Sequence, residues 1–114
     1  MRDVDNRQYV MFYEAVAADN SRSIGMAVSK EGMKGWLRCP NPVLKAAEGE
    51  GCWDTGAVGQ PCAVSMSKGR WRLYYAGRQQ RPAGPFEGIG VALSTEGGSS
   101  FQGMPAEFVR RKAA

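Results

Sequence analysis

An internal repeat constrains the fold of this chain more than any single motif does. The segment RQYVMFYEA at residues 7–15 reappears as GRWRLYYAG at residues 69–77, with an offset of 62. SIGMAVSKEG at residues 23–32 reappears as GIGVALSTEG at residues 88–97, with an offset of 65, and Trp36 and Phe101 follow at that same offset. A fixed period of this kind is typical of proteins that stack similar supersecondary units. We therefore expect two similar units that pack side by side.

Each matched segment is predicted to be a β-strand. Aromatic and β-branched residues dominate these short runs, and clusters of Gly, Asn, Asp and Ser bound them. Residues 9–16 are apolar on both alternating faces except at Glu14, which indicates a sheet covered on both sides. The prediction is an antiparallel all-β fold with about four strands per unit, which in the second unit are residues 60–66, residues 70–76, residues 89–94 and a strand near Phe101.

Composition excludes several classes of function. The chain has no histidine, which removes Ser-His and Cys-His catalysis and any zinc site that needs imidazole. Its net charge of +4 comes from basic residues that are scattered along the chain, so a nucleic-acid partner is not expected. The three cysteines, Cys39, Cys52 and Cys62, form no C-x-x-C pair and are interpreted as small buried thiols. No motif indicates a cofactor or a metal.

Membrane and export signals are not expected either. No apolar run approaches the ~18 residues of a membrane-spanning helix, and the N-terminus MRDVDNRQYV has no apolar stretch of a signal peptide. We therefore expect a soluble protein without a membrane partner, cytoplasmic or organellar in preference to secreted, although the sequence leaves the compartment unknown.

The order of these motifs resembles a known superfamily. YVMFYEA, SIGMAVSKEG, Trp36, NPVL, Trp53-Asp54, GRWRLYYAG and IGVALSTEG follow one another as in the five-bladed β-propeller glycoside hydrolases, which include arabinanases, invertases and levansucrases. The resemblance covers residues 7–104. It implies about two four-stranded blades of an incomplete propeller: blade one at about residues 7–46, lacking its inner strand, and blade two at about residues 53–105.

The resemblance also implies a function. We expect a fragment of a glycosyl hydrolase-like protein that acts on or binds oligosaccharides or glycosides, with hydrolysis of O-glycosyl bonds only as part of a complete propeller. The alternative is a non-catalytic propeller that binds glycans or another protein. An open pair of blades would expose apolar faces and strand edges, so self-association is also expected.

Candidate site residues follow from the two-carboxylate chemistry of such enzymes. Asp54 and Glu14 are the candidate catalytic acids. Asp54 has the alternative of bonding backbone N–H groups in a turn, and Glu14 that of a solvated strand end. Gln60 stands before Pro61, where the superfamily often has an acid, and glutamine binds a sugar hydroxyl but transfers no proton. Trp53, Gln60 and Arg78 are the candidate substrate-binding residues, with Trp53 as a sugar-stacking platform. Tyr13, Tyr74, Tyr75, Trp36 and Trp71 are predicted to be core residues.

Overall fold

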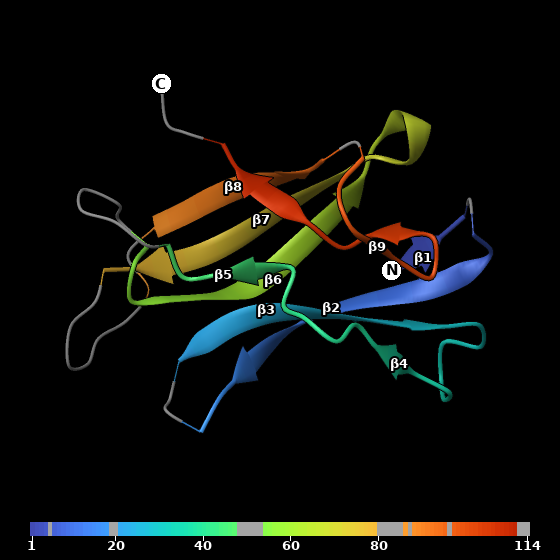
Figure 1. Ribbon diagram of the computed structural model, residues 1–114, viewed down its shortest axis with the longest axis horizontal. Helices are drawn as coiled ribbons and strands as arrows, with labels where there is room; N and C mark the ends of the chain where they lie inside the picture. The colour runs from blue at the N-terminus through green and yellow to red at the C-terminus, as the bar shows by residue number, and fades with distance from the viewer. Residues whose placement is uncertain are drawn as a thin grey trace.

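The chain is an antiparallel all-β protein, as the sequence predicts. A computed structural model describes residues 1–4, 6–18, 21–47, 54–79, 86, 88–95 and 97–111. Within these ranges the regular structure is two larger sheets, a small hairpin and a single 3₁₀ turn, η1 (Ser67–Gly69). Figure 1 shows the two larger sheets as neighbouring layers, with β2 and β3 in one and β6, β7 and β8 in the other.

The first sheet, called sheet A, contains the first copy of the repeat. Its order is β1-β2-β3-β4, and β5 also pairs with β3. The strands are β1 (Arg2–Asp3), β2 (Gln8–Val16), β3 (Arg22–Ser29), β4 (Leu37–Arg38) and β5 (Leu44–Lys45). The two long strands β2 and β3 coincide with the predicted ones. The two-residue strand β1 was not predicted, and it pairs with only the start of β2, at Gln8 and Tyr9.

The second sheet, called sheet B, contains the second copy, in the order β11-β8-β7-β6. Its strands are β6 (Ala57–Ser65), β7 (Trp71–Arg78), β8 (Gly88–Ser94) and β11 (Phe108–Arg110). The prediction of a fourth strand near Phe101 is wrong for this sheet. Phe101 lies in a separate hairpin of β9 (Ser100–Phe101) and β10 (Met104–Pro105), and β11 takes the fourth position.

Backbone pairing corrects the alignment of the repeat after the third strand. Cys39 N–H donates to Met26 C=O at 2.8 Å, and Arg111 N–H donates to Val91 C=O at 2.9 Å. The acceptors are 65 residues apart and the donors 72, so the β9–β10 hairpin is an insertion of seven residues (72 − 65). Phe108, and not Phe101, is therefore the counterpart of Trp36.

The hydrophobic core lies between the two sheets. Val10, Ile24 and Met26 of sheet A and Val58 and Leu73 of sheet B are at most 1% exposed. At one end of this core, Phe12 packs against Trp71 and Phe108, with ring centroids 6.2 and 5.8 Å away. Because one face of each sheet is apolar, stacking the sheets removes both faces from water at about 25 cal/mol per Å².

The two copies of the repeat are buried to different degrees. Trp71 and Leu73 on the inner face of sheet B are 3% and 0% exposed, whereas their counterparts Tyr9 and Met11 are 36% and 41% exposed. Tyr9 and Met11 lie on the face of sheet A that points away from sheet B. The predicted core aromatics divide in the same way: Trp71 and Tyr75 are buried, Trp36 and Tyr13 are half-buried, and Tyr74 is exposed.

The structure also bears on the interpretation of the cysteines and on the question of a membrane-spanning helix. The interpretation of the cysteines as buried thiols is wrong for Cys62, which is exposed on β6, and Cys39 is half-buried. Cys52 lies outside the described residues. Across the described part of the chain, no helix is long and apolar enough to cross a bilayer.

Candidate functional site

A β-bulge interrupts β6 at the residues that the sequence singled out. Gly59 pairs with Ala76 and Cys62 with Tyr74, so Gln60 and Pro61 together oppose the single residue Tyr75. Gln60 has a φ of 46°, in the left-handed region that few residues other than glycine adopt. Proline cannot donate to a ladder, and a bulge is one of the places in a sheet that accept it. The bulge leaves the Gln60 side chain exposed.

Glu14 of β2 reaches this bulge from sheet A. A Cβ added at Gly59 would collide with the Glu14 carboxylate, which shows that the carboxylate lies directly against the Gly59 backbone. Glu14 Oε1 is 3.8 Å from Arg22 Nη1, and both side chains are partly exposed. The same hypothetical Cβ would lie 2.9 Å from Cζ of Phe86. The absence of a side chain at Gly59 therefore lets a carboxylate and an aromatic ring meet beside the bulge.

We call Glu14, Gly59, Gln60 and Phe86 the bulge site. It combines an exposed carboxylate, an exposed amide and an aromatic ring, with the Arg22 guanidinium at its edge. Carboxylate and amide groups accept and donate hydrogen bonds to hydroxyls, and an aromatic face packs against C–H groups. The structure thus places Glu14, a predicted site residue, against Gly59, which directly precedes the predicted site residue Gln60. Sequence reasoning missed Phe86, whose only signal is that it is the one aromatic residue in the loop GRQQRPAGPFE.

Asp54 lies in a different environment, which we call the Asp54 cluster. Its side chain is 2% exposed. Oδ2 accepts a hydrogen bond from the Tyr75 hydroxyl at 2.8 Å and from Arg110 Nε at 2.7 Å. Arg110 also donates through Nη2 to the Lys45 carbonyl and lies 5.7 Å from the centroid of the Tyr75 ring. The cluster joins the turn before β6 to β7, to β11 and to β5 of sheet A.

The surroundings of the cluster shift the pKa of Tyr75. Burial, with a smaller contribution from the hydrogen bond to Asp54, raises the pKa of the Tyr75 hydroxyl to about 12. The neutral hydroxyl is therefore the form that donates to Asp54 at physiological pH. Together with the Arg110 cation, it satisfies a carboxylate that would be costly to bury alone.

The two predicted acids thus differ in what they can do. The Asp54 carboxylate is held by two donors and has almost no access to solvent, whereas the Glu14 carboxylate is accessible beside the bulge. General acid–base work requires a carboxylate within hydrogen-bond reach of the substrate. Of the two carboxylates, only that of Glu14 is exposed enough for a substrate to reach it.

The remaining predicted residues lie elsewhere. Arg78 ends β7 and is half-buried, and its carbonyl accepts a hydrogen bond from Gly56 N–H at 2.8 Å. This places Arg78 at the end of sheet B where β6 starts, beside the turn that contains Asp54. Trp53, the predicted stacking platform, lies outside the described residues. Among the residues that the structure describes, no group of three or more acidic or cysteine side chains is arranged to hold a metal ion.

Comparison with known proteins adds no family. No protein-family model matches the chain, and a search of curated proteins gives no match.

Proposed function

We propose that this chain is an oligosaccharide-binding part of a β-propeller protein related to the glycoside hydrolases, in which sheets A and B are two adjacent blades. The observation that carries the proposal is the bulge site, where Glu14 of β2 and Phe86 lie against Gly59, the residue before the exposed Gln60. The order of the repeat motifs supports the assignment of the two sheets as blades.

Binding is preferred over hydrolysis because of the state of the two acids. Two-carboxylate hydrolysis needs both groups beside the glycosidic bond, about 5–9.5 Å apart. Asp54 is buried and bound by Tyr75 and Arg110, and Gln60 cannot transfer a proton. Glu14 alone supplies one carboxylate, which suffices to bind hydroxyl groups.

Hydrolysis is the second candidate, and the accessible carboxylate of Glu14 favours it. In that case Glu14 acts as one of the two carboxylates, and the other comes from a part of a complete propeller beyond these two sheets. Arg22, 3.8 Å from Glu14, would then help to hold the carboxylate in place.

Titration of the ¹⁵N-labelled chain with arabino- and fructo-oligosaccharides, followed by NMR, tests the proposal. We expect saturable shifts at Glu14, Gln60 and Phe86. Glu14→Gln, Gln60→Ala and Phe86→Ala should each weaken binding by about fivefold, the value of one hydrogen bond or stacking contact. Glu31→Gln is the matched control, because Glu31 is an exposed carboxylate on a turn, away from the bulge, and pairs with Lys34.

A parallel assay for released reducing sugar separates the two candidates. We expect no release from the isolated chain. Release that disappears in Glu14→Gln would favour hydrolysis over binding alone. Shifts that do not saturate with any of these sugars, or that saturate equally in the three variants, would reject the bulge site as a sugar site.

A further inference from the structure

Among the residues that the structure describes, no strand pairs with the edge of β2 beyond β1, and we call this stretch the open edge of β2. Met1 and Val10 exchange two backbone hydrogen bonds, with Val10 N–H donating at 2.7 Å and the Met1 amino group donating at 2.9 Å. Because backbone direction alternates along a strand, Phe12, Glu14 and Val16 turn their N–H and C=O groups to the same side as Val10. With the described residues, the backbone groups of these three make no hydrogen bond on that side.

Sheet B shows what covers the equivalent edge. The counterparts of Phe12, Glu14 and Val16 at the offset of 62 are Tyr74, Ala76 and Arg78 on β7. These three pair with Cys62, Gly59 and Ala57 of β6. An antiparallel strand with the conformation of residues 57–62 therefore fits the open edge of β2.

A second correspondence concerns a tyrosine and an arginine. The Tyr13 ring lies over Gly25 as the Tyr75 ring lies over Gly90: an added Cβ would be 2.6 Å and 2.5 Å, respectively, from Cζ of each ring. Arg38 pairs with Ala27 on β3 as Arg110 pairs with Ala92 on β8.

Residues directly opposite one another share a face of a sheet. Ala27 opposes both Met11 and Arg38, so Arg38 lies on the same face as Tyr13. In sheet B the corresponding hydroxyl and guanidinium both donate to Asp54. Tyr13 and Arg38 make no side-chain hydrogen bond to any residue that the structure describes, whereas Tyr75 and Arg110 share the Asp54 carboxylate.

We propose that the open edge of β2 binds an extended peptide strand that carries an aspartate just before it. The strand pairs antiparallel to β2 at Phe12, Glu14 and Val16, and the aspartate carboxylate accepts hydrogen bonds from the Tyr13 hydroxyl and the Arg38 guanidinium. The positive charge of Arg38 complements that carboxylate, and strand addition to a free edge is a recurring mode of peptide recognition.

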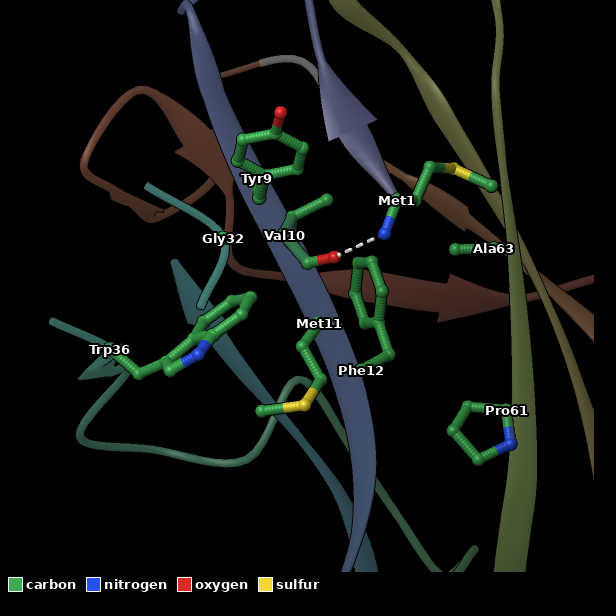
Figure 2. Close-up of a pocket in the computed structure, with 9 residues that line it drawn as sticks. All are labelled: Met1, Tyr9, Val10, Met11, Phe12, Gly32, Trp36, Pro61 and Ala63. Atoms are coloured by element: carbon green, nitrogen blue, oxygen red, sulfur yellow. Dashed lines mark hydrogen bonds between the residues drawn. The ribbon is translucent and has the colours of Figure 1, made fainter. Parts of the chain in front are cut away.

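The surface around this edge fits such a peptide. An open pocket of about 360 Å³ wraps around β2 beside Met1. Figure 2 shows Met11 and Trp36 on one side of β2, and Phe12 on the other side, below Met1 and between β2 and β6. The peptide would thus extend the line of β1 and cover apolar side chains on both faces.

A synthetic peptide of residues 54–62 of this chain is the probe, because it contains Asp54 and the residues of β6 that pair with Tyr74, Ala76 and Arg78 of β7. We expect saturable NMR shifts along β2 and at Tyr13 and Arg38. A peptide with Asp54→Asn should bind about tenfold more weakly, since it loses charge-assisted hydrogen bonds. Equal binding of the two peptides would overturn the carboxylate site, and no saturable binding of either would overturn the proposal.

Variants of the chain separate the two halves of the proposed site. Tyr13→Phe and Arg38→Gln should each weaken binding of the peptide by about tenfold. Tyr74→Phe and Arg72→Gln are matched controls, because that pair is exposed on sheet B and should leave binding unchanged. Val16→Pro removes an outward N–H without removing a β2–β3 bond, so it should weaken the peptide while Val16→Thr does not.

A small carboxylate tests whether strand pairing is needed for binding. Acetate that binds at Tyr13 and Arg38 as tightly as the peptide would overturn strand addition, because a free carboxylate would then suffice. The variants distinguish this result from oligosaccharide binding at the bulge site, since Tyr13→Phe and Arg38→Gln change side chains on the face of sheet A opposite the Glu14 side chain.

Discussion

At the scale of single residues, Asp54 shows how a buried charge is made tolerable. Its carboxylate, a candidate catalytic acid from the sequence, holds four segments together through Tyr75 and Arg110. Its partners come from residues 21 and 56 positions away, which no local pattern indicates.

Replacing Asp54 by asparagine should destabilise the fold. Asn keeps the shape of the side chain but loses the charge that Arg110 and Tyr75 need, so we expect a loss of about 1–3 kcal/mol in the free energy of unfolding. Urea denaturation followed by circular dichroism measures this loss. Glu31→Gln, at an ion pair of 3.9 Å between exposed side chains, should change stability by less than about 0.5 kcal/mol. Wild-type stability in Asp54→Asn would contradict a structural role for the cluster.

The raised pKa of Tyr75 predicts a loss of stability at alkaline pH. The pKa of the Tyr75 hydroxyl is about 12 in the folded chain and about 10 in the unfolded chain. Its contribution to the free energy of unfolding is therefore complete below pH 10 and disappears as pH rises toward 12. Two pKa units correspond to up to about 3 kcal/mol. In denaturation curves from pH 9 to 12, Tyr75→Phe should lack this part of the alkaline decline, whereas Tyr74→Phe should retain it. Parallel declines in wild type and Tyr75→Phe would count against the Tyr75–Asp54 bond.

At the scale of elements, the same cross-strand pair occurs once in each sheet. Tyr13 covers Gly25 between β2 and β3, and Tyr75 covers Gly90 between β7 and β8. A tyrosine ring laid over a glycine on the neighbouring strand fills the space that the missing side chain leaves. The two pairs differ in their surroundings, because the Tyr75 ring is buried against sheet A whereas Tyr13 lies on an open face.

Alanine at the two glycines should therefore have unequal effects. In Gly90→Ala the new methyl group collides with a ring that is held by Asp54 and Arg110, which should cost about 1–3 kcal/mol. In Gly25→Ala the half-buried Tyr13 ring can move outward, so we expect less than about 1 kcal/mol. Thermal or urea denaturation of the two variants, compared with wild type, gives the difference. Equal losses would show that the Tyr13 ring is held as firmly as the Tyr75 ring.

At the scale of the whole molecule, stacking two sheets leaves two outer faces. On sheet A this face presents Tyr9 and Met11, which are 36% and 41% exposed. On sheet B the exposed apolar residues include Tyr74, Val64, Ile89 and Val109. Several hundred Å² of exposed apolar surface corresponds to many kcal/mol at about 25 cal/mol per Å², comparable to the ~5–15 kcal/mol stability of a domain.

The isolated chain should accordingly be marginally stable and should self-associate. Sedimentation velocity over a range of concentrations should show a rising average mass. Met11→Lys places a charge on the open face of sheet A and should shift the chain toward monomer, whereas Met33→Lys, at a turn residue that is 91% exposed, should not. A monodisperse monomer with a sharp, high-midpoint unfolding transition would contradict the expectation that the open faces associate.

The sequence by itself determined the local structure of this protein. Short aromatic and β-branched runs bounded by turn residues are strands in any all-β context, and β2, β3, β7 and β8 lie where those runs predict. The repeat offset of 65 also aligns Gly25 with Gly90. These features depend on contacts between neighbouring strands and on local propensity, which the order of residues records directly.

Only the tertiary structure decided the partners of distant segments. It assigned the fourth strand of sheet B to β11, because backbone bonds to β8 select residues beyond an inserted hairpin. It placed Glu14 and Phe86 against the bulge. It also paired Asp54 with Arg110, which is 56 residues away in the sequence. Whether an acid lies in solvent or in an ion pair depends on which sheets pack together. That choice is made by the burial of whole faces and not by any short motif.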